Sequence, residues 1–150
     1  MRGYFEIGIF HPKCSQNVGT LWRSAIQLGA AGIFTIGERY HRQPTDTAHA
    51  SQHVPLRHYP TFEEMLAHRP YGAFLIGIEM GGTPLIDYVH PAQAIYLLGA
   101  EDHGLPVNVL ERCNHVVSLH AVGQLSYNVA VAGSIVLYHR MFLRLSTTAT

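Results

Sequence analysis

The segment "AIYLLGAEDHGLP" at residues 94–106 decides the fold. Its first half, residues 94–100, is an uninterrupted apolar run of strand length, and "AFLIGIE" at residues 73–79 is another. Strands without polar alternation are typical of a parallel sheet that is covered by helices on both faces. Glycines and charged residues follow the first run directly, at the strand ends where such sheets bind ligands. The segment therefore predicts an α/β fold with a site after residue 98.

The rest of the chain alternates between strand and helix patterns, with Gly and Pro between them. Strands are expected at residues 4–10, 33–37, 56–59, 73–79, 94–100 and 115–119. Helices are expected at residues 17–28, 61–68, 106–113 and 127–145, with Asn17 capping the first and Ser126 the last. Residues 38–55 read as a polar loop and residues 146–150 as a disordered tail. Because no repeat or linker divides the chain, residues 1–150 are expected to form one domain.

The composition limits the classes of function. The chain is 47% hydrophobic and only 13% charged, with ten basic and ten acidic residues. The low charge favours an apolar surface that is buried in an oligomer, and the zero net charge argues against nucleic-acid binding by bulk charge alone. No apolar run approaches the roughly 20 residues that span a bilayer, and no signal peptide is apparent, so we expect a cytoplasmic protein. Two cysteines and eleven histidines without metal-ligand spacing predict neither a disulfide framework nor a metal site.

The first segment that could carry chemistry is "QNVGTLWRSAIQLGA" at residues 16–30. On a helix, Arg23 lies on the polar face, opposite an apolar face that contains Val18, Leu21, Trp22 and Ala25. Arg23 is then either an ordinary solvated arginine or a guanidinium that a rigid helix holds near a strand-end site. Gly19 leaves room beside it for another backbone or a ligand.

Two more segments share this ambiguity. In "LLGAEDHGLP", residues 97–106, glycines flank Glu101, which lies either in a surface turn or at a pocket edge as an anchored carboxylate. In "LSYNVAVAGSIVLYHR", residues 125–140, Asn128 lies in the first turn of a mostly apolar helix. That helix is expected to be buried or to face a second copy of the chain.

The three segments together resemble the SpoU (TrmH-like) branch of the SPOUT methyltransferases over almost the whole chain. Its three motifs are matched by Asn17, Gly19 and Arg23, by Gly99, Glu101, Gly104 and Leu105, and by "SYNVAVA" at residues 126–132. The resemblance implies a single SPOUT domain with a deep C-terminal trefoil knot, which holds S-adenosylmethionine in its loops. It also implies a homodimer through the C-terminal helix and methyl transfer to a ribose 2′-hydroxyl of RNA.

The resemblance assigns residue roles as well. Arg23, Asn17, Glu101 and Asn128 would be catalytic, in a site that mixes both subunits. The cofactor would lie against Ile78, Glu79, Gly99, Gly104, Leu119, Leu125 and Ser126. The chain departs from the family pattern in its third motif, with Tyr127 for Leu, Ala130 for Ser and "SLHAVG" in place of a common Ile-Pro-Met.

RNA contact is expected between residues 39 and 59. This segment contains three basic residues, Arg39, Arg42 and Arg57, and one acidic residue, Asp46, so its local charge is positive, as phosphate contact requires. The alternative is a solvated loop. Transfer RNA is the expected substrate and ribosomal RNA the alternative. A catalytically silent RNA-binding dimer is a further alternative, and a Rossmann oxidoreductase is disfavoured because no GxGxxG follows the first strand.

Overall fold

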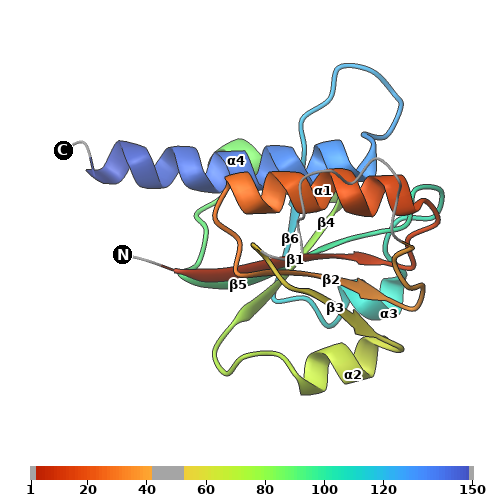
Figure 1. Cartoon of the computed structure of the whole chain (residues 1–150). Coiled ribbons are helices and arrows are strands. Elements are labelled where there is room, and N and C mark those ends of the chain that lie inside the picture. Colours follow the sequence, from red (N-terminus) through yellow and green to blue (C-terminus); the bar gives the residue numbers. More distant parts are fainter. Residues whose placement is uncertain (1–2, 42–52, 149–150) are drawn as a thin grey trace.

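The computed structural model describes residues 3–41 and 53–148 (Figure 1). At its centre lies a six-stranded sheet in the order β3-β2-β1-β5-β4-β6, in which every pair of neighbours is parallel. The strands are β1 (Tyr4–Phe10), β2 (Gly32–Ile36), β3 (Leu56–Tyr59), β4 (Phe74–Pro84), β5 (Gln93–Leu98) and β6 (His115–Ser118). The predicted α/β fold with a parallel sheet is confirmed.

Helices cover both faces of this sheet. Figure 1 shows α1 (Ser15–Gln27) and α4 (Val129–Thr148) side by side on one face, and α2 (Phe62–Ala67) with α3 (Val107–Leu110) on the other. A short 3-10 helix, η2 (Leu85–Asp87), follows β4. None of the helices in the described ranges is long and apolar enough to cross a membrane.

The apolar run that decides the fold is buried on both faces. Residues 94–98 of β5 are each at most 2% exposed. Ala94, Tyr96 and Leu98 face the layer of α1 and α4, while Ile95 and Leu97 face the layer of α2 and α3. The run lacks polar alternation because neither face of this strand meets solvent.

Helix α4 packs closely against the sheet and α1. A Cβ on Gly133 would lie 2.6 Å from Leu21 Cδ1 and 2.9 Å from Leu98 Cδ1, so even an added methyl group would displace these leucine side chains. The Ser134 hydroxyl also lies 2.7 Å from the hydroxyl of Ser24 on α1. The small residues of α4 therefore serve close packing within the chain.

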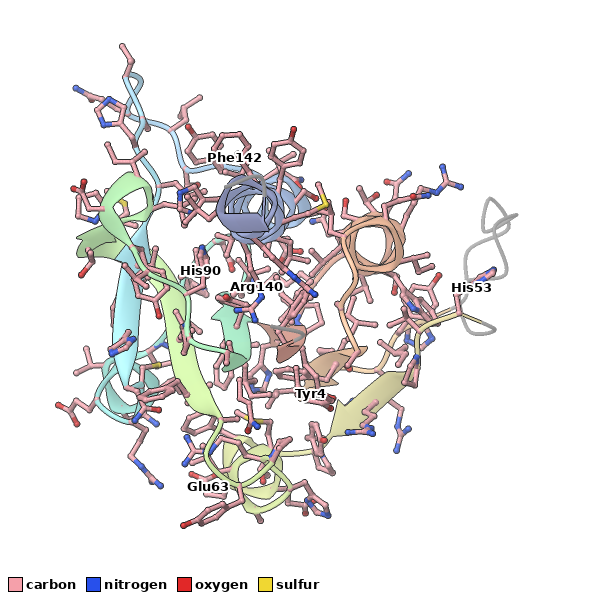
Figure 2. All side chains as sticks on the ribbon, turned by 90° about the vertical axis from the view of Figure 1, so that its left-hand side faces the viewer. Tyr4, His53, Glu63, His90, Arg140 and Phe142 are labelled. Carbon is pink, nitrogen blue, oxygen red and sulfur yellow. The ribbon has the colours of Figure 1, made fainter. Side chains whose placement is uncertain are left out.

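A buried polar network ties the middle of α4 to the segment before β5. Arg140 donates to the carbonyl oxygens of Pro91 at 2.7 Å and Ala92 at 3.1 Å, and to the Tyr96 hydroxyl at 3.0 Å. The Tyr96 hydroxyl also lies within hydrogen-bond distance of His90, 2.6 Å from its Nδ1. Figure 2 shows Arg140 and His90 together beneath α4. Burial lowers the pKa of His90 to about 3, so His90 is neutral.

Both predicted helix caps are wrong. Helix α1 begins at Ser15 after Cys14, whose side chain makes no capping bond, so Asn17 lies inside the first turn. Helix α4 begins at Val129 rather than near residue 127. Its cap is Asn128, whose side-chain oxygen accepts from the backbone N–H groups of residues 130 and 131 at 2.9 and 3.3 Å. Asn128 takes the capping position because its carbonyl reaches two free N–H groups, which leaves Ser126 in the loop.

The ends of β4 and α4 also differ from the prediction. Residues 80–84, beyond the expected end of the strand at residue 79, continue β4 through a shift in its pairing with β6 between Ile78 and Thr83. Gly81, with φ +84, lies within the shifted stretch, which explains why a glycine-rich sequence still belongs to a strand. Helix α4 runs to Thr148, so residues 146–148 are helical and not a disordered tail. Residues 149–150 lie outside the described ranges.

Candidate functional site

A cavity of about 500 Å³ lies where β4, β5 and β6 end. Its walls come from the residues after β5, the start of the irregular part of β4, and the long loop between β6 and α4. In Figure 1 that loop stands out from the body beside the start of α4. The position agrees with the general rule that parallel sheets bind ligands at the carboxyl ends of their strands.

Every residue that the sequence singled out for cofactor contact lines this cavity: Ile78, Glu79, Gly99, Gly104, Leu119, Leu125 and Ser126. Leu98 and Val129 also contribute to the wall and were not predicted to do so. Both belong to apolar patterns that predict only a buried strand and a buried helix. Nothing in their residue type distinguishes a cavity wall from the core.

The loop after β5 is held in a tight shape against the wall. Gly104 has φ +63, and a Cβ on Gly99 would lie 2.3 Å from the carbonyl carbon of Gly104. Both positions therefore require glycine, one for its conformation and one for the close approach of two backbone segments. Glu79 holds this loop from the β4 side, because its Oε2 accepts from the Leu105 N–H at 2.8 Å. Its Oε1 accepts from the Met80 N–H at 2.9 Å, so both carboxylate oxygens are engaged by backbone.

The three motifs meet in a chain of hydrogen bonds beside the cavity. Asn17 on α1 donates from Nδ2 to Glu101 Oε1 at 2.9 Å. Asn128, at the start of α4, donates from Nδ2 to Asn17 Oδ1 at 3.0 Å. Since Glu101 lines the cavity, these hydrogen bonds fix one wall of the cavity to the two long helices, α1 and α4. The structure thus brings together three of the four residues that were predicted to be catalytic.

Glu101 is kept ionised by its surroundings. Partial burial raises the pKa of its carboxyl group, but the hydrogen bonds from Asn17 and from backbone N–H groups outweigh this and lower the pKa below the ordinary value. One of those groups is the N–H of Lys13, 3.2 Å from Glu101 Oε2. The Lys13 ammonium also pairs with the carboxylate of Asp102. Sequence analysis missed Lys13, because a single lysine in a loop follows no pattern.

The cavity wall is acidic. Glu79, Glu101 and Asp102 line it; Lys13 pairs with Asp102, but the described lining residues themselves include no lysine or arginine. Such a wall favours a small molecule that carries a positive charge. No three His, Cys, Asp or Glu side chains within residues 3–41 and 53–148 are grouped so as to hold a metal ion.

Arg23 lies apart from the other three predicted catalytic residues. It is exposed on α1, is not among the described residues that line the cavity, and makes no hydrogen bond or ion pair with any described residue. The space beside Gly19, expected to admit a ligand, faces Tyr40, whose hydroxyl would lie 3.5 Å from a Cβ on that glycine. Within one chain, therefore, Arg23 is not part of the cavity.

A second hollow, about 720 Å³ in volume, crosses the outer side of α4 beside α1 and η2. Thr20, one turn of α1 before Arg23, forms part of its edge. The floor is almost wholly apolar, and Val131, Ile135 and Tyr138 on it are 47%, 37% and 58% exposed. We call this hollow the α4 groove; its lining residues are Thr20, Leu28, Leu85, Ile86, Ala130, Val131, Ser134, Ile135, Tyr138, His139 and Phe142. Figure 2 shows Phe142 on the side of α4 that faces away from the sheet.

The three arginines predicted to contact RNA are in different situations. Arg39 is exposed just beyond β2. Arg57 on β3 is paired with Glu6, with Nη1 3.1 Å from Oε1, and Tyr4 donates to the same oxygen at 2.8 Å. Arg57 is therefore engaged in a structural ion pair between strands. Arg42 lies outside the described residues.

Comparison with known proteins relates this chain to RNA methylases. The sequence matches the SpoU rRNA methylase family over residues 5–138. It is 28% identical over 144 residues to an uncharacterized tRNA/rRNA methyltransferase of Archaeoglobus fulgidus, in a match that covers 91% of this chain. The match covers 63% of that relative, so the chain spans less than two thirds of its length.

Solved structures show the same fold. One, described as giving structural insights into the 2-OH methylation of C/U34 on tRNA, has a TM-score of 0.84 at 25% identity, covering 98% of this chain and 99% of that one. Another is the SpoU methyltransferase AviRb from Streptomyces viridochromogenes in complex with the cofactor AdoMet. It has a TM-score of 0.82 at 23% identity, covering 97% of this chain and 60% of AviRb. At that identity the likeness to AviRb shows the fold alone.

Proposed function

The chain belongs to the SpoU rRNA methylase family, and from this we propose that it transfers a methyl group from S-adenosylmethionine to a ribose 2′-hydroxyl of RNA, with tRNA as the substrate. The observation that carries the proposal is the hydrogen-bonded chain of Asn128, Asn17 and Glu101 at the wall of the cavity. The similar structure concerned with methylation on tRNA favours tRNA over rRNA. A catalytically silent RNA-binding dimer would not need to keep these hydrogen-bonded polar side chains.

The cavity fits S-adenosylmethionine in size and chemistry. Its volume, about 500 Å³, is within the range of small-molecule sites, and AviRb holds this cofactor within the same fold. We propose that the backbone of the glycine-containing loops and the apolar side chains of Ile78 and Leu119 hold the adenosine part. The carboxylates of Glu79 and Glu101 favour the positive charge of the sulfonium. When bound, the cofactor supplies an electrophilic methyl group.

The protein must make the ribose hydroxyl a better nucleophile. A 2′-hydroxyl reacts slowly unless its proton is removed or the developing oxyanion is stabilised. Arg23 stays charged, so we assign it to binding a phosphate next to the target ribose, and to stabilising the negative charge that the 2′-oxygen gains as its proton passes to that phosphate or to water. Asn17, Glu101 and Asn128 keep the loops of the site in place around the reacting groups.

Because Arg23 lies outside the cavity of its own chain, we propose that it acts in the cavity of a second copy. The α4 groove is the candidate interface, since an exposed apolar hollow of this size is typical of a surface that another protein covers. Arg23 is one helical turn from Thr20 at the edge of that groove. A homodimer through α4 would therefore combine Arg23 of one chain with the cavity of the other.

We also propose that the C-terminal segment is threaded into a trefoil knot, as the family resemblance implies. In support, β6 is the last strand in the sheet order, yet α4 packs over the middle of the sheet, where Gly133 lies against Leu98 of β5. The chain therefore crosses β4 between β6 and α4.

Replacing Arg23 tests the proposed function. Arg23→Ala should keep the fold and the affinity for S-adenosylmethionine but lose methyl transfer to RNA, because the removed contacts are to the RNA phosphate and to the developing charge, not to the cofactor. Gln27→Ala is the matched control, since Gln27 is exposed on the same helix and outside the motif. Calorimetry measures cofactor binding and labelled cofactor measures transfer. Equal transfer rates for Arg23→Ala and the parent protein would reject the role of Arg23.

A further inference from the structure

Tyr127 is the last residue of the loop between β6 and α4, and its side chain reaches back to the start of that loop. Its hydroxyl donates to the backbone carbonyl of His120 at 2.6 Å. His120 follows β6 by two residues, within "SLHAVG" at residues 118–123. We propose that Tyr127 is a positioning residue: it ties both ends of the loop at residues 120–127 together and so shapes the cavity wall for S-adenosylmethionine. This inference rests on the proposed function for the identity of the cofactor.

The loop has little else to hold it. Among the described residues, no backbone–backbone hydrogen bond lies within 120–127. Val122 and Leu125 are 98% and 90% exposed, so the loop is not anchored by packing of its apolar side chains. Its sequence also contains no proline, so no residue of the loop has its backbone restricted by a ring. The bond from Tyr127 to His120 is thus the contact that closes the loop.

The loop is also a major part of the cavity wall. Five of its residues between the two tied ends line the cavity: Ala121, Gly123, Gln124, Leu125 and Ser126. Tyr127 itself lines the cavity and precedes Asn128, which is fixed to Asn17 and to the start of α4. Asn128 therefore fixes the C-terminal end of the loop, and the hydrogen bond from the Tyr127 hydroxyl to His120 holds the N-terminal end against it. Holding a binding loop in its bound shape raises affinity, because less conformational entropy is lost on binding.

Tyr127→Phe removes the hydroxyl and leaves the ring. Tyr71→Phe is the matched control, because Tyr71 is fully exposed and outside the cavity. Two quantities are measured: the affinity for S-adenosylmethionine by calorimetry, and the backbone NMR order parameters of residues 121–126 in the cofactor-free protein. We expect Tyr127→Phe to bind about fivefold more weakly, as the loss of one ordinary hydrogen bond predicts, and to show lower order parameters in the loop. In transfer assays KM for the cofactor should rise while kcat stays nearly unchanged.

The outcomes separate this inference from the proposed function. If the parent protein does not bind S-adenosylmethionine, the proposed cofactor is wrong, and the loop order parameters of Tyr127→Phe still decide whether this residue holds the loop. If the parent binds and Tyr127→Phe binds equally well, the positioning role is overturned. A loss of affinity without lower loop order parameters in the cofactor-free protein also overturns it, because the hydroxyl would then act on the cofactor directly.

Discussion

Replacing Asn17 with alanine removes the central link between the three motifs. Asn17 donates to Glu101 Oε1 at 2.9 Å and accepts from Asn128 at 3.0 Å, so one substitution breaks two hydrogen bonds. The first involves a charged acceptor and the second joins two neutral amides. Both the free energy of unfolding and the organisation of the cavity wall should therefore respond.

The expected size follows from the two bonds. A hydrogen bond to a charged group contributes about 1.5–3 kcal/mol and a neutral one about 0.5–1.5 kcal/mol, and the lower ends apply here because water reaches Glu101 and Asn128. That gives about 2 kcal/mol. Alanine has a higher helix propensity than asparagine, which offsets about 0.5 kcal/mol of this loss in the free energy of unfolding. The net loss of about 1.5 kcal/mol lowers Tm by roughly 3–6 °C in a domain of this size.

The effect should also depend on pH. The pKa of Glu101 is lowered in the folded protein, so its contribution to stability is present above the pKa of the unfolded chain and is lost as pH falls through the folded pKa. The hydrogen bond from Asn17 is one cause of the lowered Glu101 pKa. The difference in the free energy of unfolding between the parent protein and Asn17→Ala should therefore have its full size at neutral pH. It should narrow as the solution is acidified below about pH 4.5.

Urea unfolding at several pH values measures this directly, with Gln16→Ala as the control for a helix substitution at an exposed neighbour. Asn17→Ala should also lower methyl transfer, since Glu101 loses its side-chain partner. A stability for Asn17→Ala equal to that of the parent protein at pH 7, or a gap that does not change in acid, would refute the reasoning.

Three further predictions concern other parts of the molecule. Gly104→Ala should lower both Tm and cofactor affinity, because Gly104 has φ +63 and a Cβ there would lie 2.3 Å from Glu79 Oε2. Adding Glu79→Ala to this variant should recover part of the loss in Tm, because it removes the clash. Ile135→Asp should place a charge in the α4 groove and give a monomer in sedimentation velocity that binds the cofactor but transfers no methyl group; a dimer would contradict the proposed interface. The pKa of His90, lowered to about 3, means that the unfolded chain binds a proton below about pH 6.5 while the folded one does not. Stability should therefore fall on the order of 1 kcal/mol between pH 7 and 5, and His90→Asn should remove this loss when denaturant unfolding is compared at the two pH values.

The sequence predicted the sheet well because burial leaves a direct mark on residue type. The apolar run at 94–98 has no polar alternation, and its side chains face two helical layers. The apolar face of α1 was also correct, since Val18, Leu21, Trp22 and Ala25 are buried. These features depend on the spacing of apolar residues along a short segment, which can be read directly from the sequence.

Features that depend on distant partners were not predictable in the same way. Asn17 suits a helix cap by residue type, and only the position of Glu101 on another loop gives it a different partner. Arg57 suits a phosphate contact, and only the neighbouring strands place Glu6 beside it. The role of Tyr127 depends on a carbonyl at the far end of its own loop. In each case the deciding contact follows from tertiary placement.

The most direct test of the central claim is to locate the methyl group. The purified protein is incubated with unmodified tRNA and isotopically labelled S-adenosylmethionine, and nuclease digests are analysed by mass spectrometry, with Arg23→Ala in parallel. We predict that the label appears on the ribose of a single nucleotide, as a 2′-O-methyl group, and is absent with Arg23→Ala. Label on a base, or no label in tRNA or rRNA from a protein that binds the cofactor, would contradict the account.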